Sequence, residues 1–173
     1  MRVLLLNQFY PPDVAATGQL LADVAEGLVR RGHEVHVVCS RRAYGGEGGV
    51  LVGDLQQQGV HVHRLAATGY GRSNLPGRLM DYFSFYLLAV RCVLRMPRMD
   101  VCLCLTTPPF ISLVGYYLKC RRRTKPMLWT MDLYPEIAVA FGVFSRNGLV
   151  HRFLRHLARQ VYRAADGVIS LGE

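Results

Sequence analysis

The chain has 173 residues, of which 51% are hydrophobic and 19% charged, and its formal net charge is +9. This length fits one domain with a substantial core, and the composition excludes both a disordered chain and an integral membrane protein. The positive charge indicates an anionic partner, and composition leaves open nucleic acid, a phosphorylated ligand and an acidic membrane surface.

The hydrophobic pattern alternates between short apolar runs and amphipathic stretches along the whole chain. It predicts strands over residues 2–7, 34–40, 60–65, 100–105, 126–131 and 166–171, and helices over residues 17–31, 77–96, 110–122, 136–141 and 149–164. Thr17 and Gly32 are the expected N-cap and C′ residues of the first helix. This alternation predicts an α/β fold with a doubly wound, mainly parallel, Rossmann-like sheet.

The five cysteines and the apolar runs bear on location. The cysteines are odd in number and irregularly spaced, which is typical of reduced core thiols in a cytoplasmic protein rather than of a metal site. Residues 1–6 are shorter than the apolar region of a secretory signal, and no run approaches the ~20 apolar residues of a spanning helix. We therefore expect a cytoplasmic protein without a bound metal or other cofactor.

The loop over residues 8–18 joins the first strand to the first helix, where unpaired N–H groups suit a phosphate. Small residues at Ala15, Ala16 and Gly18 would let a ligand approach the backbone closely. The glycine pattern G-x-G-x-x-G and the P-loop pattern are both absent, which weakens a standard dinucleotide or ATP site. An ordinary strand-to-helix connection is the alternative.

Two further loops follow predicted strands at the same edge of the sheet. Thr106 and Thr107 precede two prolines, and their hydroxyls either bind a polar ligand or cap the next helix, of which the cap is favoured. Asp132 and Glu136 follow the strand over residues 126–131. Their carboxylates suit sugar hydroxyls or acid–base chemistry, and helix capping is the equally weighted alternative.

The last helix is two-sided, with basic residues on one face and apolar residues on the other. It is either a surface helix packed on the sheet or a site for anionic lipid or diphosphate. The helix over residues 77–96 carries more aromatic side chains than one buried stripe requires, so it serves domain packing or peripheral contact with the inner membrane. No nucleic-acid-binding signature is present. The candidate anion-binding residues on the last helix are Arg152, Arg155, Arg159 and Arg163.

Five short motifs in order along the chain carry a family resemblance. They are N-Q-F-Y-P-P at residues 7–12 with T-G at 17–18, R-G-H-E-V at 31–35, T-P-P at 107–109, D-L-Y-P-E at 132–136 and A-D-G-V-I at 165–169. Together they resemble the N-terminal Rossmann-like domain of a GT-B fold, family 4 bacterial glycosyltransferase. The resemblance is greatest to the fucosamine and colanic-acid transferase type of polysaccharide biosynthesis.

This resemblance implies a retaining transfer from a nucleotide sugar to a polyprenyl-diphosphate-linked or saccharide acceptor. It implies that Thr17 and Gly18 face the donor diphosphate, that Asp13, Thr107 and Glu136 lie on the acceptor side, and that Asp132 is the candidate catalytic residue. Many family members carry a histidine at the position of Asp132.

The resemblance also bears on domain organisation. It makes residues 1–173 the acceptor-side domain and places the donor-binding residues in a C-terminal domain outside this sequence. We therefore expect an excised domain that is inactive alone. A non-catalytic subunit of a split transferase and an unrelated nucleotide-binding domain are the alternatives.

Overall fold

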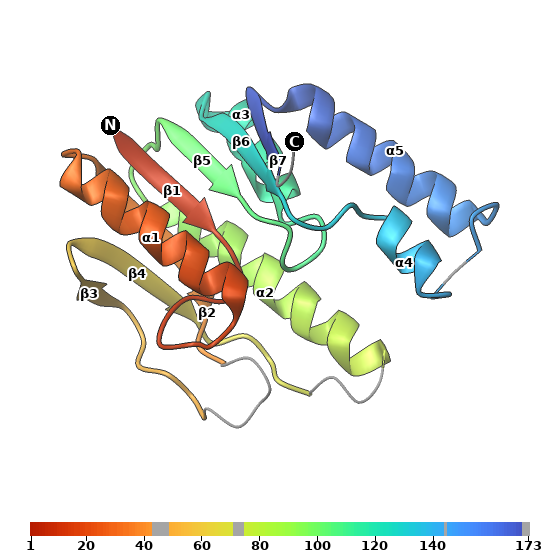
Figure 1. The fold of residues 1–173 in the computed structure, drawn as a ribbon, viewed down its shortest axis with the longest axis horizontal. Coiled ribbons are helices and arrows are strands. Elements are labelled where there is room, and N and C mark those ends of the chain that lie inside the picture. Colours follow the sequence, from red (N-terminus) through yellow and green to blue (C-terminus); the bar gives the residue numbers. More distant parts are fainter. Residues whose placement is uncertain (43–48, 71–74, 144, 171–173) are drawn as a thin grey trace.

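The computed structural model describes residues 1–42, 49–70, 75–143 and 145–170, which form a seven-stranded sheet with helices on both faces (Figure 1). The predicted strand end at residue 171 lies outside the described residues. The elements in chain order are β1 (Arg2–Leu6), α1 (Ala16–Arg30), β2 (Glu34–Ser40), β3 (Leu55–Gln57), β4 (Val60–Leu65), α2 (Leu75–Arg95), β5 (Val101–Cys104), α3 (Ser112–Arg122), β6 (Lys125–Thr130), α4 (Glu136–Ala140), α5 (Leu149–Ala164) and β7 (Gly167–Ser170).

The strand order is β3-β4-β2-β1-β5-β6-β7, and every neighbouring pair is parallel except β3 with β4. This confirms the predicted doubly wound, mainly parallel sheet. The order of strands reverses between β1 and β5, where Leu5 is paired with Leu103. In an open α/β sheet, ligands bind beyond the carboxyl ends of the strands at such a reversal.

The strand β3 is absent from the sequence-based prediction. It has three residues, L-Q-Q, and pairs antiparallel with β4 through a two-residue turn at Gln58 and Gly59. Both turn residues have positive φ, 50° and 82°, as the tight hairpin turn that matches strand twist requires. A polar strand of three residues leaves no hydrophobic alternation to detect, so its position depends on pairing with β4.

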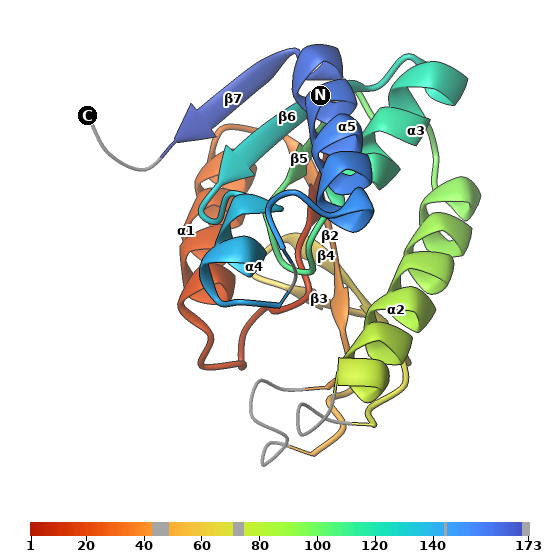
Figure 2. The ribbon, with the colours of Figure 1, turned by 90° about the vertical axis from the view of Figure 1, so that its right-hand side faces the viewer.

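Apolar side chains fill both faces of the sheet. One core lies under α1, where Leu21, Ala22 and Ala25 are buried against β1, β2 and β4. The other core lies under α2, α3 and α5, whose buried residues include Phe85 and Val114. Figure 2 shows α1 on one side of the sheet and these three helices on the other. Helices on both faces leave the carboxyl edge of the sheet as its open side.

The helix ends correct three of the capping predictions. Helix α1 begins at Ala16 with the extended Ala15 as its N-cap, so Thr17 lies inside the first turn and does not cap it. Gly32 is the C′ residue as predicted: its φ is 78°, and the N–H groups of Gly32 and His33 donate to Val29 and Leu28. Helices α3 and α4 have no side-chain cap, so neither the loop threonines nor Asp132 caps a helix.

A chain of hydrogen bonds links two carboxylates through two histidines on β2 and β4. His36 Nε2 lies 3.1 Å from Glu34 Oε1, His36 Nδ1 lies 3.2 Å from His63 Nε2, and His63 Nδ1 lies 3.4 Å from Asp54 Oδ2. Burial lowers the pKa of His63, and the hydrogen bond with His36 is the main cause that lowers the pKa of Glu34.

Candidate active site

A polar cavity of about 550 Å³ lies at the carboxyl edge of the sheet, beside the reversal between β1 and β5. All three loops singled out in the sequence line it, together with the first half of α2. Its volume is typical of small-molecule sites, which span roughly 300–1,000 Å³. The lining residues are Gln8, Phe9, Val14, Ala15, Ala16, Thr17, Arg78, Asp81, Tyr82, Thr107, Asp132 and Tyr134.

Buried polar side chains fix the first loop from below. Asn7 Nδ2 donates to the Phe9 carbonyl at 2.8 Å, and Asp13 Oδ1 accepts from the Ala15 N–H at 3.0 Å. The buried Arg64 donates to the Pro11 carbonyl. A β-carbon on Gly18 would lie 3.1 Å from the Phe9 carbonyl carbon, so the loop backbone occupies the space beside this glycine. These contacts position the N-terminus of α1 against the cavity.

The second loop joins the first directly. The Gln8 N–H donates to the Thr107 carbonyl at 2.8 Å, which ties the loop after β1 to the loop after β5. Phe110 ends this loop with a φ of 63°, a left-handed conformation uncommon for a non-glycine residue. Its ring lies 6.3 Å from the ring of Tyr134 at a tilted angle of 51°. The second loop therefore supports the third through an aromatic pair.

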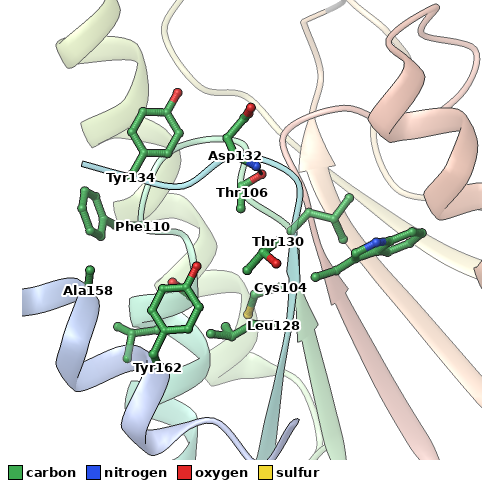
Figure 3. A pocket seen from close by; sticks show the side chains of 13 residues that line it. Cys104, Thr106, Phe110, Leu128, Thr130, Asp132, Tyr134, Ala158 and Tyr162 are labelled. Carbon is green, nitrogen blue, oxygen red and sulfur yellow. Dashed lines mark hydrogen bonds between the residues drawn. The ribbon is translucent and has the colours of Figure 1, made fainter. Parts of the chain in front are cut away.

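The third loop places a carboxylate and a phenol side by side. The Asp132 N–H donates to Thr106 Oγ1 at 3.3 Å, and Figure 3 shows the Asp132 and Tyr134 side chains extending in the same direction. Burial, followed by the Asp132 carboxylate, raises the pKa of Tyr134. The Tyr134 hydroxyl therefore stays protonated at neutral pH and can donate a hydrogen bond to a ligand.

Figure 3 shows a second, small cavity below this loop, lined by Phe110, Thr130, Asp132, Tyr134 and Tyr162 among others. Its volume is about 30 Å³, which is enough to admit water. Burial and then the Glu136 carboxylate raise the pKa of Tyr162. This cavity is too small for a substrate, but it connects the site to α5.

Helix α2 contributes residues that the sequence analysis missed. Arg78, Asp81 and Tyr82 line the polar cavity from its first turns. Asp81 Oδ1 accepts from Thr68 Oγ1 and from the Tyr70 N–H, both at 2.9 Å, so it also fixes the loop after β4. The available signal was the pair of charged residues near the start of the helix, just before its uncharged run over residues 82–90. That helix follows a strand and begins at the carboxyl edge.

The structure brings together three of the predicted site residues, Thr17, Thr107 and Asp132, at the polar cavity. Asp13 is buried within the first loop, while Gly18 packs on the backbone of residues 9–10. The exposed Glu136 is the first residue of α4. These last three residues do not line the cavity, so they affect it only by positioning the segments in which they lie.

The basic residues of α5 are exposed as expected, but its apolar face is only partly buried. Ala158, Val161 and His151 are buried, whereas Val150 and Phe153 stay 57% and 61% exposed. The buried side of the helix runs through Ala158. The apolar residues next to Arg152 therefore lie on the exposed side. The arginines on the exposed surface are Arg152, Arg155, Arg159 and Arg163.

Metal binding and membrane spanning can be assessed for the described residues, 1–42, 49–70, 75–143 and 145–170. These residues contain no group of three histidine, cysteine, aspartate or glutamate side chains arranged to hold a metal ion. None of their helices combines the length and apolar character needed to cross a membrane.

The fold is an α/β domain of the Rossmann-like class, with a polar cavity beside the strand reversal. Residues 16–173 match the family described as the glycosyl transferase 4-like domain, and the chain belongs to this family. The coarse resemblance stated from the motifs is thereby confirmed.

The chain is similar to one further protein in sequence and to two solved structures in fold. It is 30% identical over 94 residues to a probable glycosyltransferase, WbjE, of Pseudomonas aeruginosa, over 54% of this chain and 24% of the relative. It resembles sucrose-phosphate synthase of Thermosynechococcus elongatus, with a TM-score of 0.66, 11% identity, and coverage of 97% of this chain and 41% of that one.

The second structure is the catalytic domain of starch synthase IV of Arabidopsis thaliana bound to ADP and acarbose. The TM-score is 0.54 and the identity 15%, over 76% of this chain and 34% of that one. Both solved structures are GT-B glycosyltransferases, and at these identities they show the fold. This chain spans less than half of each of the three proteins.

Proposed function

We propose that residues 1–173 form the acceptor-side, N-terminal domain of a retaining glycosyltransferase. The enzyme transfers a sugar from a nucleotide sugar to a lipid-linked or saccharide acceptor in cell-surface polysaccharide biosynthesis. A C-terminal domain outside this sequence binds most of the donor. The observation that carries the proposal is the polar cavity at the strand reversal, which opens at the edge where a second domain would complete a cleft.

The chemistry of the lining supports a sugar ligand. Two carboxylates, Asp81 and Asp132, and the hydroxyls of Thr17, Thr107 and Tyr134 offer hydrogen-bond acceptors and donors. Sugar hydroxyls need both kinds of partner, which few other neutral ligands require in this number. We assign the acceptor's attacking hydroxyl to Asp132, whose carboxylate accepts its proton or its hydrogen bond.

The N-terminus of α1 supports donor contact. Ala15, Ala16 and Thr17 line the cavity, and the first N–H groups of a helix lack intrahelical partners. They carry a partial positive charge that favours phosphate oxygens. Thr17 and Gly18 then lie on the donor-diphosphate side of the cleft, while Thr107, Asp13 and Glu136 belong to the acceptor side.

The exposed surfaces support peripheral contact with the cytoplasmic face of the inner membrane. Helix α2 exposes Leu79, Phe83 and Leu87, each by more than half, and α5 exposes Phe153 next to its arginines. Exposed apolar side chains beside basic ones match the interface of an anionic bilayer. This contact would bring the cavity to acceptors held in the membrane.

Two measurements test the proposal. Calorimetry of the 173-residue chain with a panel of nucleotide sugars should show no micromolar binding, because donor affinity resides mainly in the other domain. In the enzyme that contains this chain, Asp132→Asn should lower kcat/KM by roughly 10²–10⁴-fold, the range of general acid–base catalysis.

Asp23→Asn, an exposed position on α1, is the matched control and should leave kcat/KM unchanged. Equal activity of both variants would show that Asp132 takes no part in the reaction. A product with inverted anomeric configuration, followed by NMR, would exclude the retaining mechanism.

A further inference from the structure

The turn before α3 holds an aromatic residue in a backbone conformation that favours glycine. The Ile111 N–H donates to the Pro108 carbonyl at 3.2 Å, so Pro109 and Phe110 are the two central residues of this turn. Phe110 has a φ of 63°. A proline followed by a residue with positive φ is the pattern of a type II turn, whose second central position normally carries glycine or asparagine. Phenylalanine at this position therefore strains the backbone, at a cost in stability that glycine would avoid.

The Phe110 ring lies against Tyr134, a side chain that borders three hollows. The two ring centroids are 6.3 Å apart and the ring planes are inclined by 51°, which is a favourable geometry for an aromatic pair. Tyr134 lines the polar cavity, the small cavity below it, and an apolar groove of about 520 Å³ that is lined by Leu79, Phe83 and Phe141 among others. Open space on several sides leaves a ring free to turn unless a neighbour holds it, and Phe110 is such a neighbour.

The direction of the Tyr134 side chain matters because its hydroxyl can reach a ligand in the polar cavity. Figure 3 shows Phe110 on one side of the Tyr134 ring and the hydroxyl on the other, extending in the same direction as Asp132. This hydroxyl is a hydrogen-bond donor at neutral pH. A hydrogen bond weakens steeply with distance and angle, so a small rotation of the ring would misplace the donor.

We propose that Phe110 is a positioning residue, whose ring directs the Tyr134 hydroxyl so that it donates a hydrogen bond to the acceptor sugar beside Asp132. This proposal rests on the proposed function, because the polar cavity must hold the acceptor. It explains the strained turn by substrate recognition rather than by folding, since local strain persists where the side chain is needed at that position. Phe110→Gly should therefore relax the turn and weaken acceptor binding together.

Two substitutions separate the ring from the strain. Phe110→Ala removes the ring and keeps the positive φ, whereas Phe110→Gly removes the ring and relieves the strain. In the 173-residue chain, Phe110→Gly should melt about 2–4 °C above Phe110→Ala, the effect of relieving one left-handed residue. In the enzyme that contains this chain, both variants should raise the KM for the acceptor about tenfold, the loss of one hydrogen bond, and leave the KM for the nucleotide sugar unchanged.

Arg123→Gly is the matched control for strain relief. Arg123 is the exposed C-cap of α3, with a φ of 55°. Its replacement by glycine relieves a similar left-handed conformation away from the polar cavity. It should raise the Tm in the same way and leave the KM for the acceptor unchanged, so that acceptor binding follows the Phe110 ring and not the stability of the chain.

Tyr134→Phe tests whether Phe110 acts through Tyr134. It should raise the KM for the acceptor about tenfold on its own, and adding Phe110→Ala to it should cause no further rise. A second measurement does not need activity. In the 173-residue chain labelled with fluorotyrosine, Tyr134→Phe identifies the fluorine NMR signal of Tyr134. Phe110→Ala should shift that signal, and Arg123→Gly should not.

Either of two results would overturn the proposal. One is an unchanged Tyr134 fluorine signal in Phe110→Ala. The other is a full further rise in the KM for the acceptor when Phe110→Ala is added to Tyr134→Phe. The proposed function fails separately. An enzyme that transfers no sugar, with a signal that still shifts, contradicts the transferase and leaves Tyr134 positioned by Phe110, whereas sugar transfer with an acceptor KM insensitive to Phe110→Ala contradicts only the role of Phe110.

Discussion

Replacement of Gly18 by alanine tests how tightly the first loop is packed on α1. The added β-carbon would lie 3.1 Å from the Phe9 carbonyl carbon and 3.2 Å from the Phe9 oxygen and the Tyr10 nitrogen. All three neighbours are backbone atoms, and the Phe9 carbonyl accepts a hydrogen bond from the buried Asn7 at 2.8 Å. The loop therefore cannot move aside as a flexible side chain would.

Gly27, in the same helix, is the matched control. A β-carbon there meets only the end of the Arg30 side chain at 3.8 Å. Alanine favours a helix over glycine by about 1 kcal/mol, so Gly27→Ala should stabilise the chain by that amount. Gly18→Ala has the same gain but an overpacking cost of about 1–3 kcal/mol, which leaves it about 1 kcal/mol less stable than wild type.

Urea denaturation followed by circular dichroism measures both variants under one set of conditions. A difference of about 2 kcal/mol between them corresponds to about 4–8 °C in Tm for a chain of this size. Equal stabilisation by both substitutions would refute the close approach of α1 to residues 9–10. It would also reassign Gly18 to open space that a ligand could occupy.

Three further outcomes follow from the described contacts. Because burial lowers the pKa of His63, the unfolded chain binds more protons than the folded chain below about pH 6.5, so stability should fall as the pH drops from there. His63→Gln should flatten this dependence in denaturation midpoints measured from about pH 5 to 7, whereas the exposed His156→Gln should not. Arg64→Met should destabilise the chain by about 1–3 kcal/mol in urea denaturation, since it leaves the Pro11 carbonyl without its donor, and an unchanged midpoint would contradict this role. The chain should sediment with anionic vesicles at low salt, and added salt should reduce the sedimented fraction. Glutamine substitutions of the four α5 arginines, Arg152, Arg155, Arg159 and Arg163, should reduce it as well. No binding at low salt would exclude the membrane contact.

Much of the fold could be predicted because it depends on local patterns. Buried parallel strands require continuous apolar runs, and covering helices require an apolar stripe, so the six parallel strands and the five helices were found within a few residues of their bounds. The C′ position of Gly32 was found because its left-handed φ favours glycine. The strand β3 was missed because three polar residues carry no periodic signal.

The capping predictions failed at Thr17 and at the loop threonines for one reason. A side-chain hydroxyl has several partners within reach, and the sequence does not say which one it takes. Thr106 accepts from the Asp132 N–H on a different loop, 26 residues away, instead of capping α3. Tertiary contacts between loops therefore decide a choice that local preference for N-caps left open.

The sequence by itself determined the class of fold, and it predicted a site at the carboxyl edge of the sheet on three loops, all of which line the polar cavity. These follow from periodicity and from the rule that parallel strands end at one edge. Only the tertiary structure decided that Thr17, Thr107 and Asp132 share a cavity with Arg78 and Asp81. It also decided that an apolar groove between α2 and α4 adjoins that cavity. The cavity and the groove both depend on how α2 lies across the sheet, which is set by side-chain packing between elements distant in the sequence.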